Sequence, residues 1–520
     1  MKKKVLFLGF LIVSVLFFMI IAKPWHYLLL SSGYKTKVET VNLSLDEKIE
    51  DFNYLYEVIC SSVPMIDDYK NIYGFSFADR KNDYMKLIEK TNNDYDFFCT
   101  LNAILEDVPS FHTDLVLPET VGLLNCYNST NVKSNTEIKA YTHYWNNLIE
   151  GKKKEKVDNK YICFTYVDGC YILDSAFSTI DEKCEGTLQE VNGIPVDEYI
   201  KKSQSVFNLY YDGKNKKPCR TKIVFNEEKG EDVGLIITDN SGKNTKKTFK
   251  FSMEEEIIYF YRFEPIDNED IIDYAINDTL YIKINSFDNR NGQTVKNILS
   301  ESSEKVILDL RENYGGNSDF AVKYIYPELF EQNYYINNKW YIPDSIENRK
   351  IRDNIFSKLF LGLYRTEKSP YKNDRNTPYL YSVSNYEYKG KYGKNKKLVC
   401  LVSHKTGSAA DSFVSFIKDK KLGTIIGNNT GGEGLMGSYV ADSLPNSKLV
   451  FVYMPGGAKN SDGTDNSVVG TAPDKYVSTS MEEIKKMREI GVSFMNSENI
   501  EKVIQYDSVL KSGIDFLNNQ

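Results

Sequence analysis

Histidine is scarce in this 520-residue chain, which contains only His26, His112, His143 and His404. Chemistry that needs an imidazole base therefore has few candidates. Basic residues show no excess either, because 65 Lys and Arg stand against 72 Asp and Glu and are scattered along the chain. Since a nucleic-acid-binding protein usually carries a basic stripe, we expect no nucleic-acid partner.

The eight cysteines form no CxxC pair and show no metal-ligand spacing. The sequence therefore predicts neither a metal site nor a cofactor. Internal repeats are also absent from the chain. Its content of 41% apolar and 26% charged residues is ordinary for a globular protein, and its length allows two or three domains.

The chain begins with three lysines, Lys2–Lys4, and continues with an uncharged apolar run from Val5 to Ala22. As a helix, this run would reach about 27 Å, which is enough to cross a hydrocarbon core. We therefore expect residues 5–22 to be a single-pass anchor in the cell membrane, with the N-terminus inside and the body extracytoplasmic. The alternative is a cleaved secretory signal, which would export the body as well.

Helical patterns dominate the next segment, and we interpret residues 44–125 as a small helical N-terminal domain. Ser44 and Glu47 have the spacing of a capping box at the start of its first helix. From about 160 to 260 the pattern changes to short β-type runs. Within them, Asn192-Gly193 lies between two apolar segments and predicts a tight hairpin turn, because both residues tolerate a positive φ.

From residue 278 the chain alternates strands and helices, which is typical of an α/β layer fold. Apolar runs at 280–284, 306–310 and 398–402 predict buried strands, and helical spacing follows the last of them from Ala409. The stretch 330–397 is rich in Tyr, Lys and Asn and is expected to be an insertion in a core that spans 278–480. Residues 481–520 are expected to add C-terminal helices.

Ser408 lies between a predicted buried strand and a predicted helix. At that place backbone amides are free and the helix dipole is positive, which favours an oxygen that becomes negative. A serine nucleophile and its oxyanion intermediate need this environment. The simpler interpretation is that Ser408 caps the helix, since Ser is among the commonest N-cap residues.

A second motif, Asp309-Leu310-Arg311-Glu312-Asn313-Tyr314-Gly315-Gly316, also follows a predicted buried strand. Paired glycines allow the backbone to approach a ligand closely and to present its amides. A tight strand-to-helix turn would explain one glycine, but it does not require the preceding Asp, Arg and Asn.

Together these motifs resemble the S41 family of serine peptidases, the tail-specific and tricorn-core group. Asp309–Gly316 is similar to the family's Asp-Leu-Arg-x-Asn-x-Gly-Gly signature, and Thr406–Asp411 is similar to its nucleophile motif. Gly427–Gly432 resembles the turn that follows the nucleophile. Leu105–Thr113 resembles the family's Asp-x-His-Thr segment, and Glu190–Val196 resembles the hairpin of its PDZ-like module.

The resemblance implies a crotonase/ClpP-like α/β core, a PDZ-like β module at 160–260 and hydrolysis through an acyl-enzyme on Ser408. Tail-specific members use a Lys base in the Gly-x-Gly turn, but Glu433 stands at that position here. The alignment therefore excludes a Ser–Lys dyad. Tricorn-like and nisin-resistance-type members use a His from the N-terminal region instead, which makes His112 the expected general base.

The third catalytic residue is left open by the resemblance. The tricorn-like pattern has a Ser directly before the His, whereas Phe111 stands here. Asp107, Glu433 and Asp465 are the candidates to orient the imidazole. The oxyanion hole is expected to use the Ala409 amide together with the amide of Gly315 or Gly316.

The expected function is that of a membrane-anchored serine endopeptidase that cuts exported proteins or peptides. In this interpretation the PDZ-like module binds or gates the substrate by strand addition. The alternative is a catalytically silent relative that binds a peptide or another ligand in the same cleft.

Overall fold

The computed structural model describes residues 38–519 apart from short gaps. The gaps are 75, 109, 111, 125–131, 133–134, 153–160, 175–177, 179–185, 203–208, 227–231, 240, 251, 254–270, 347, 350–364, 373–377, 435–438 and 491–499. The expected anchor at 5–22 lies outside the described residues. Within the described ranges, no helix is both long and apolar enough to span a bilayer.

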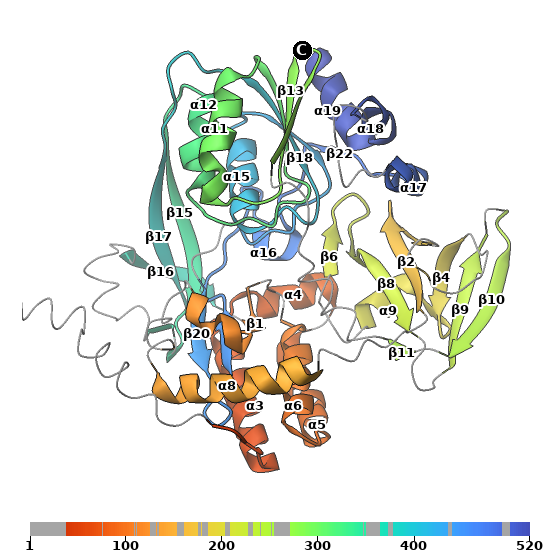
Figure 1. The fold of residues 1–520 in the computed structure, drawn as a ribbon, viewed down its shortest axis with the longest axis vertical. Helices are drawn as coiled ribbons and strands as arrows, with labels where there is room; N and C mark the ends of the chain where they lie inside the picture. Colours follow the sequence, from red (N-terminus) through yellow and green to blue (C-terminus); the bar gives the residue numbers. More distant parts are fainter. Residues whose placement is uncertain are drawn as a thin grey trace, which may run out of the picture.

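The N-terminal part is a cluster of helices, shown in red and orange in Figure 1. It contains α3 (Leu45–Ser62), α4 (Met65–Tyr73), α5 (Lys81–Glu89) and α6 (Asp94–Leu105). The capping box at the start of α3 is confirmed, because Ser44 and Glu47 bond each other's backbone amides. The sequence did not predict α8 (Thr136–Lys152), whose Trp145 packs against Phe98 of α6 with ring centroids 6.2 Å apart.

A β module follows, built on a sheet with the strand order β10-β9-β4-β3-β2-β8-β11. Its strands are β2 (Tyr161–Val167), β3 (Cys170–Leu173), β4 (Thr187–Val191), β8 (Lys222–Asn226), β9 (Asp232–Thr238), β10 (Asn244–Lys250) and β11 (Ser252–Met253). The predicted tight turn is confirmed, because β4 and β5 (Ile194–Pro195) pair across Asn192 and Gly193, which both have positive φ. The helix α9 (Val196–Lys202) and a separate hairpin, β6 (Leu209–Asp212) and β7 (Lys217–Arg220), complete the module.

The third part is the predicted α/β layer, with the strand order β12-β13-β14-β18-β19-β22. The strands are β12 (Ile271–Ile276), β13 (Thr279–Ile284), β14 (Lys305–Asp309), β18 (Lys397–Val402), β19 (Thr424–Gly427) and β22 (Lys475–Tyr476). From β13 to β22 the strands are parallel. Side chains alternate between the two faces, so each face carries its own apolar core.

Helices cover both faces of this sheet. On one face lie α11 (Gly292–Glu301), α12 (Tyr326–Leu329) and α15 (Ser408–Asp419), which share a core with Leu308 and Cys400. On the other face lie the C-terminal helices α18 (Ile500–Tyr506) and α19 (Ser508–Asn518), next to α17 (Met481–Ile490) (Figure 1). Because the strands from β13 to β22 are parallel, their carboxyl ends and the loops that follow them lie at a single edge of the sheet.

The expected insertion contains a three-stranded antiparallel sheet, β15 (Tyr334–Pro343), β17 (Pro378–Tyr388) and β16 (Arg365–Lys372). Figure 1 shows it running from the α/β layer toward the helical part. At its far end, Tyr341 pairs through its backbone with Gly457.

A hairpin late in the chain pairs with a short strand of the N-terminal part. The strands β20 (Val440–Ser443) and β21 (Val450–Tyr453) pair with each other, and β21 also pairs with β1 (Asp114–Leu115). In Figure 1 this blue hairpin lies among the red and orange helices. The segment just before β1, which carries His112, is therefore attached to the catalytic half of the chain.

Candidate active site

Ser408 is the first residue of α15 and follows the loop after β18. Its φ is 50°, a left-handed conformation that is rare for a non-glycine residue. The N-cap of α15 is Gly407, and its cap makes no side-chain hydrogen bond. The hydroxyl of Ser408 makes no hydrogen bond to any described residue, so the structure contradicts the interpretation of Ser408 as a helix cap.

Gly315 lies directly against Ser408. A Cβ atom at position 315 would lie 2.7 Å from the Ser408 Cβ and 2.9 Å from the Ala409 amide nitrogen. The φ of Gly315 is also strongly positive, at 107°. A side chain is therefore excluded at this position by its conformation and by the available space. The glycine motif and the nucleophile motif, which are far apart in sequence, meet here.

The amides around Ser408 differ in their availability. The Gly315 amide already donates to Asn313 Oδ1 at 2.8 Å, which favours Gly316 of the two glycines expected for the oxyanion hole. Within the described ranges, the amides of Gly316 and Ala409 have no acceptor. These two donors, one from each motif, are therefore available to a further acceptor.

His112 lies beside Glu433, with 3.7 Å between its Nε2 and the Glu433 Oε2. The imidazole is partly exposed and stacks against the Tyr439 ring, whereas the carboxylate is buried. Glu433 is flanked by two residues that contact Ser408. The Gly432 carbonyl accepts the Ser408 amide at 2.9 Å, and Gly434 packs against the Ser408 carbonyl. The structure thus brings His112 to the loop that lines Ser408.

The other two candidate acids are held elsewhere. The Asp107 carboxylate accepts hydrogen bonds from Tyr84 at 2.6 Å and from Arg80 at 3.1 Å. Asp465 caps the short helix α16 (Asn466–Val469) and accepts a hydrogen bond from the Tyr341 hydroxyl. Of the three candidates, Glu433 is therefore the one whose carboxylate the structure places beside the imidazole. Phe111 lies outside the described residues.

Asp411 organises the loop that carries Glu433, a role that the sequence analysis did not assign. Its buried carboxylate accepts hydrogen bonds from the Thr430 hydroxyl, from the Gly434 amide at 3.2 Å and from Asn466 Nδ2 at 2.8 Å. Burial raises the pKa of Asp411, although these hydrogen bonds act in the opposite direction. One signal was available in the sequence, because Asp411 lies one helical turn after Ser408.

Asn313 is a second residue whose role was missed. Its side chain donates to the Ile284 carbonyl at 2.9 Å and accepts the Gly315 amide, while its backbone carbonyl accepts the Gly407 amide at 3.0 Å. It therefore joins the end of β13, the glycine motif and the nucleophile loop. The motif marked Asn313 as important, but two of its three partners, Ile284 and Gly407, are distant in sequence.

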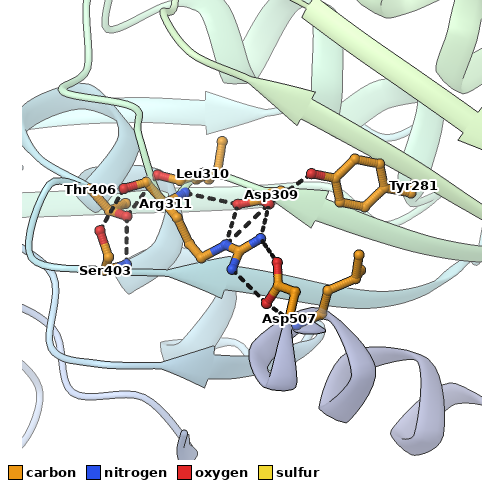
Figure 2. A network of polar contacts seen from close by, with 8 residues as sticks. Tyr281, Asp309, Leu310, Arg311, Ser403, Thr406 and Asp507 are labelled. Atoms are coloured by element: carbon orange, nitrogen blue, oxygen red, sulfur yellow. Dashed lines mark hydrogen bonds and ion pairs between the residues drawn. The ribbon is translucent and has the colours of Figure 1, made fainter. Parts of the chain in front are cut away.

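Arg311 and Asp309 hold the loops and take no direct part in the site. Figure 2 shows the Arg311 guanidinium between the carboxylates of Asp309 and Asp507, with the Tyr281 hydroxyl donating to Asp309 at 2.8 Å. Burial acts to raise the pKa of Asp309, but the adjacent Arg311 outweighs it and keeps that pKa below its usual value. The nucleophile loop joins the network through Ser403 and Thr406, which donate to the carbonyls of Arg311 and Leu310.

His404 lies on the nucleophile loop but packs away from the imidazole site. Its ring is 4.4 Å from the ring of Tyr210, which belongs to the β6–β7 hairpin. Burial, together with the charge of Lys405, lowers the pKa of His404 to about 3. A histidine that stays neutral in this way is a poor proton acceptor at neutral pH, which leaves His112 as the better general base.

Comparison with known proteins shows which protein family this segment resembles. The model of peptidase family S41 matches residues 278–477, which contain both motifs. A search of curated proteins finds no match. The chain is similar to the solved structure of mature CPAF, with 11% identity over 89% of this chain and 98% of that one and a TM-score of 0.49.

Two further structures show the same kind of similarity. The photosystem II D1 C-terminal processing protease is 12% identical over 83% of this chain and 93% of that one, with a TM-score of 0.35. The tricorn protease is 13% identical over 74% of this chain and 34% of that one, with a TM-score of 0.22.

The family match and the two motifs define the chain as a serine peptidase. Residues 278–477 match the model of peptidase family S41, and the fold is of the mixed α/β type.

Proposed function

We propose that Ser408 is the nucleophile of this peptidase and His112 its general base, with Glu433 orienting the imidazole. The proposal rests on two contacts that connect His112 to the backbone of Ser408 through the loop of Gly432 and Glu433. His112 Nε2 is 3.7 Å from Glu433 Oε2, and the neighbouring Gly432 carbonyl accepts the Ser408 amide. The loop of Gly432 and Glu433 thus contacts the backbone of Ser408 on one side and the imidazole of His112 on the other.

In the proposed reaction, the Ser408 oxygen attacks the scissile carbonyl carbon while His112 takes the hydroxyl proton. The carbonyl oxygen becomes negative, and the amides of Gly316 and Ala409 stabilise it. The C–N bond then breaks, and His112 returns the proton to the leaving amine. Water hydrolyses the remaining ester, with His112 again accepting a proton, and Ser408 is regenerated.

A fluorophosphonate probe tests this assignment directly, because it reacts with activated serines. We expect the wild-type chain to be labelled, S408A to give no labelling, and H112A to slow labelling by about 10²–10⁴-fold. H143A is the matched control, because His143 lies on the exposed surface of α8. Labelling that survives S408A, or an unlabelled wild type, would contradict the assignment and favour a role in peptide binding.

We further propose that the protein acts as an endopeptidase at the outer side of a membrane, anchored by residues 5–22. The support is the uncharged apolar run after three lysines. Deletion of residues 1–23 is expected to release the chain from the membrane fraction without slowing fluorophosphonate labelling. A wild-type chain that alkaline carbonate washes off the membrane would contradict the anchor.

The β module is proposed to be PDZ-like and to bind substrate by strand addition. The support is its position, because its β6–β7 hairpin lies against the catalytic loops. A Cβ atom on Gly213 would approach Asn429 and Tyr476 within 2.3 Å, and the Tyr210 ring lies 4.4 Å from the ring of His404. A photo-reactive casein peptide is expected to crosslink within residues 161–253, and crosslinks confined to other segments would argue against this role.

A further inference from the structure

The C-terminal helix α19 lies beyond the segment that matches the peptidase family, which ends at residue 477. It packs closely on the catalytic sheet, since a Cβ atom on Gly513 would lie 3.3 Å from Leu401 and 3.4 Å from Val399. Its first turn is capped by Asp507, whose Oδ1 accepts the Leu510 amide at 2.9 Å. The N-terminal end of α19 is therefore fixed relative to β18.

The carboxylate that caps α19 also binds Arg311 of the glycine motif. Arg311 Nη1 donates to Asp507 Oδ1 at 2.9 Å, and Nη2 donates to Oδ2 at 2.7 Å (Figure 2). Both side chains are largely removed from solvent, with 19% of Arg311 and 4% of Asp507 exposed. A paired, planar contact of this kind fixes the orientation of the guanidinium as well as its position.

The backbone of Arg311 connects this contact to the catalytic loops. Its carbonyl accepts a hydrogen bond from the Ser403 hydroxyl, and the preceding carbonyl, of Leu310, accepts the Thr406 hydroxyl at 2.7 Å. The chain then passes through Asn313 to Gly315 and Gly316. One residue thus contacts the C-terminal helix with its side chain and the nucleophile loop with its backbone.

We propose that Asp507 is a positioning residue for catalysis, through which α19 holds Arg311 and so sets the distance between the glycine motif and Ser408. With Asp309 alone, the two guanidinium N–H groups that donate to Asp507 would have no carboxylate. Arg311 could then rotate, and the loop from 311 to 316 would follow it. Displacement of a catalytic group by about 1 Å can cost about 10²-fold in rate. Loss of the contact between Asp507 and Arg311 should therefore slow the reaction of Ser408 measurably.

The substitution D507N tests the proposal while preserving the fold. Asn caps helices as well as Asp does, so α19 should still begin at the same residue. The charge opposite Arg311 is lost, and an amide donor replaces the oxygen that accepts Arg311 Nη2. We expect fluorophosphonate labelling of Ser408 to slow by about 10- to 100-fold. D507E, which restores the charge, is expected to recover part of the rate. The matched control is D515N, an exposed position on the same helix.

Hydrogen–deuterium exchange gives a second readout that does not depend on activity. In D507N, amides in 311–317 and 403–409 are expected to exchange faster, while those of α6 keep the wild-type rate. If exchange in these loops and labelling both match D515N, the proposal is wrong. If the wild type is not labelled but D507N loosens the loops, the catalytic assignment of Ser408 fails and the positioning role stands. Uniformly faster exchange, α6 included, would show a general loss of stability and overturn the proposal.

Discussion

Ser408 has a backbone conformation that costs free energy. Left-handed φ values cost a non-glycine residue on the order of 1–2 kcal/mol, and Ser408 keeps this conformation because its neighbours hold it. Its amide is bonded to the Gly432 carbonyl, and Gly315 packs against its Cβ. The strained backbone belongs to the residue proposed as the nucleophile, so stability is lost where activity is needed.

Replacing Ser408 by glycine should therefore stabilise the protein relative to S408A while abolishing its chemistry. Glycine adopts a positive φ without penalty, although it gains entropy in the unfolded chain, so a net gain of about 0.5–1 kcal/mol is expected. Urea unfolding of S408G and S408A measures the difference, and neither variant should react with fluorophosphonate. Equal stability of the two would show that the left-handed conformation of Ser408 is not strained.

The partly buried His404 predicts a loss of stability in acid. Its pKa falls from the usual 6.5 to about 3 on folding. The unfolded chain therefore binds a proton that the folded chain rejects, and stability is lost as the pH falls from 6.5 toward 3. At pH 5 the loss should be about 2 kcal/mol relative to pH 7.5. In H404Q the free energy of unfolding should change less over this range, by about that amount, and an unchanged pH dependence would refute the interpretation.

Single elements of the site were more predictable than their contacts. The strand before Ser408, the helix after it and the hairpin turn at Asn192-Gly193 follow from local periodicity and turn chemistry. The partners of Asp411 and Asn313 do not, because they come from loops brought together only by the order of the strands. Sequence likewise left three acids open beside His112, and tertiary packing places the Glu433 carboxylate 3.7 Å from its imidazole.

Asp411 should control the element that carries Glu433. D411N keeps the shape of the side chain but replaces one accepting oxygen with a donor. The new donor opposes either the Thr430 hydroxyl at Oδ1 or both the Gly434 amide and Asn466 Nδ2 at Oδ2. We expect fluorophosphonate labelling to slow by about 10- to 100-fold because Glu433 and the Gly432 carbonyl shift. D419N, an exposed position at the other end of α15, is the control. A labelling rate equal to that of D419N would show that Asp411 does not position this loop.

At the scale of the whole molecule, the site depends on two distant parts of the chain. The divisions at 44–125, 160–260 and 278–480 stay predictions. Among the described residues, helices prevail in the first range, strands in the second and alternating elements in the third. Local patterns did not reveal that β1 pairs with β21, or that α8 belongs with the N-terminal helices. Both depend on contacts between segments hundreds of residues apart, for which a single sequence carries no periodic signal.

The connection between β20 and β21 is held by two N-terminal helices. The buried carboxylate of Asp51 in α3 accepts the amides of Asn446 at 2.7 Å and Ser447 at 2.9 Å. The indole of Trp145 in α8 donates to the Ser447 carbonyl at 2.9 Å. Since β21 pairs with β1, this connection also determines where the segment carrying His112 lies.

D51A should therefore affect both stability and catalysis. Two buried amides lose their acceptor, so the free energy of unfolding should fall by about 2–4 kcal/mol in urea titrations. Labelling of Ser408 by fluorophosphonate should also slow under conditions where the variant remains folded, because β21 and β1 shift His112 relative to Glu433. E57A, an exposed substitution on the same helix, should change neither quantity. If D51A is destabilised but labels at the wild-type rate, the helical part supports the fold without setting the position of the base.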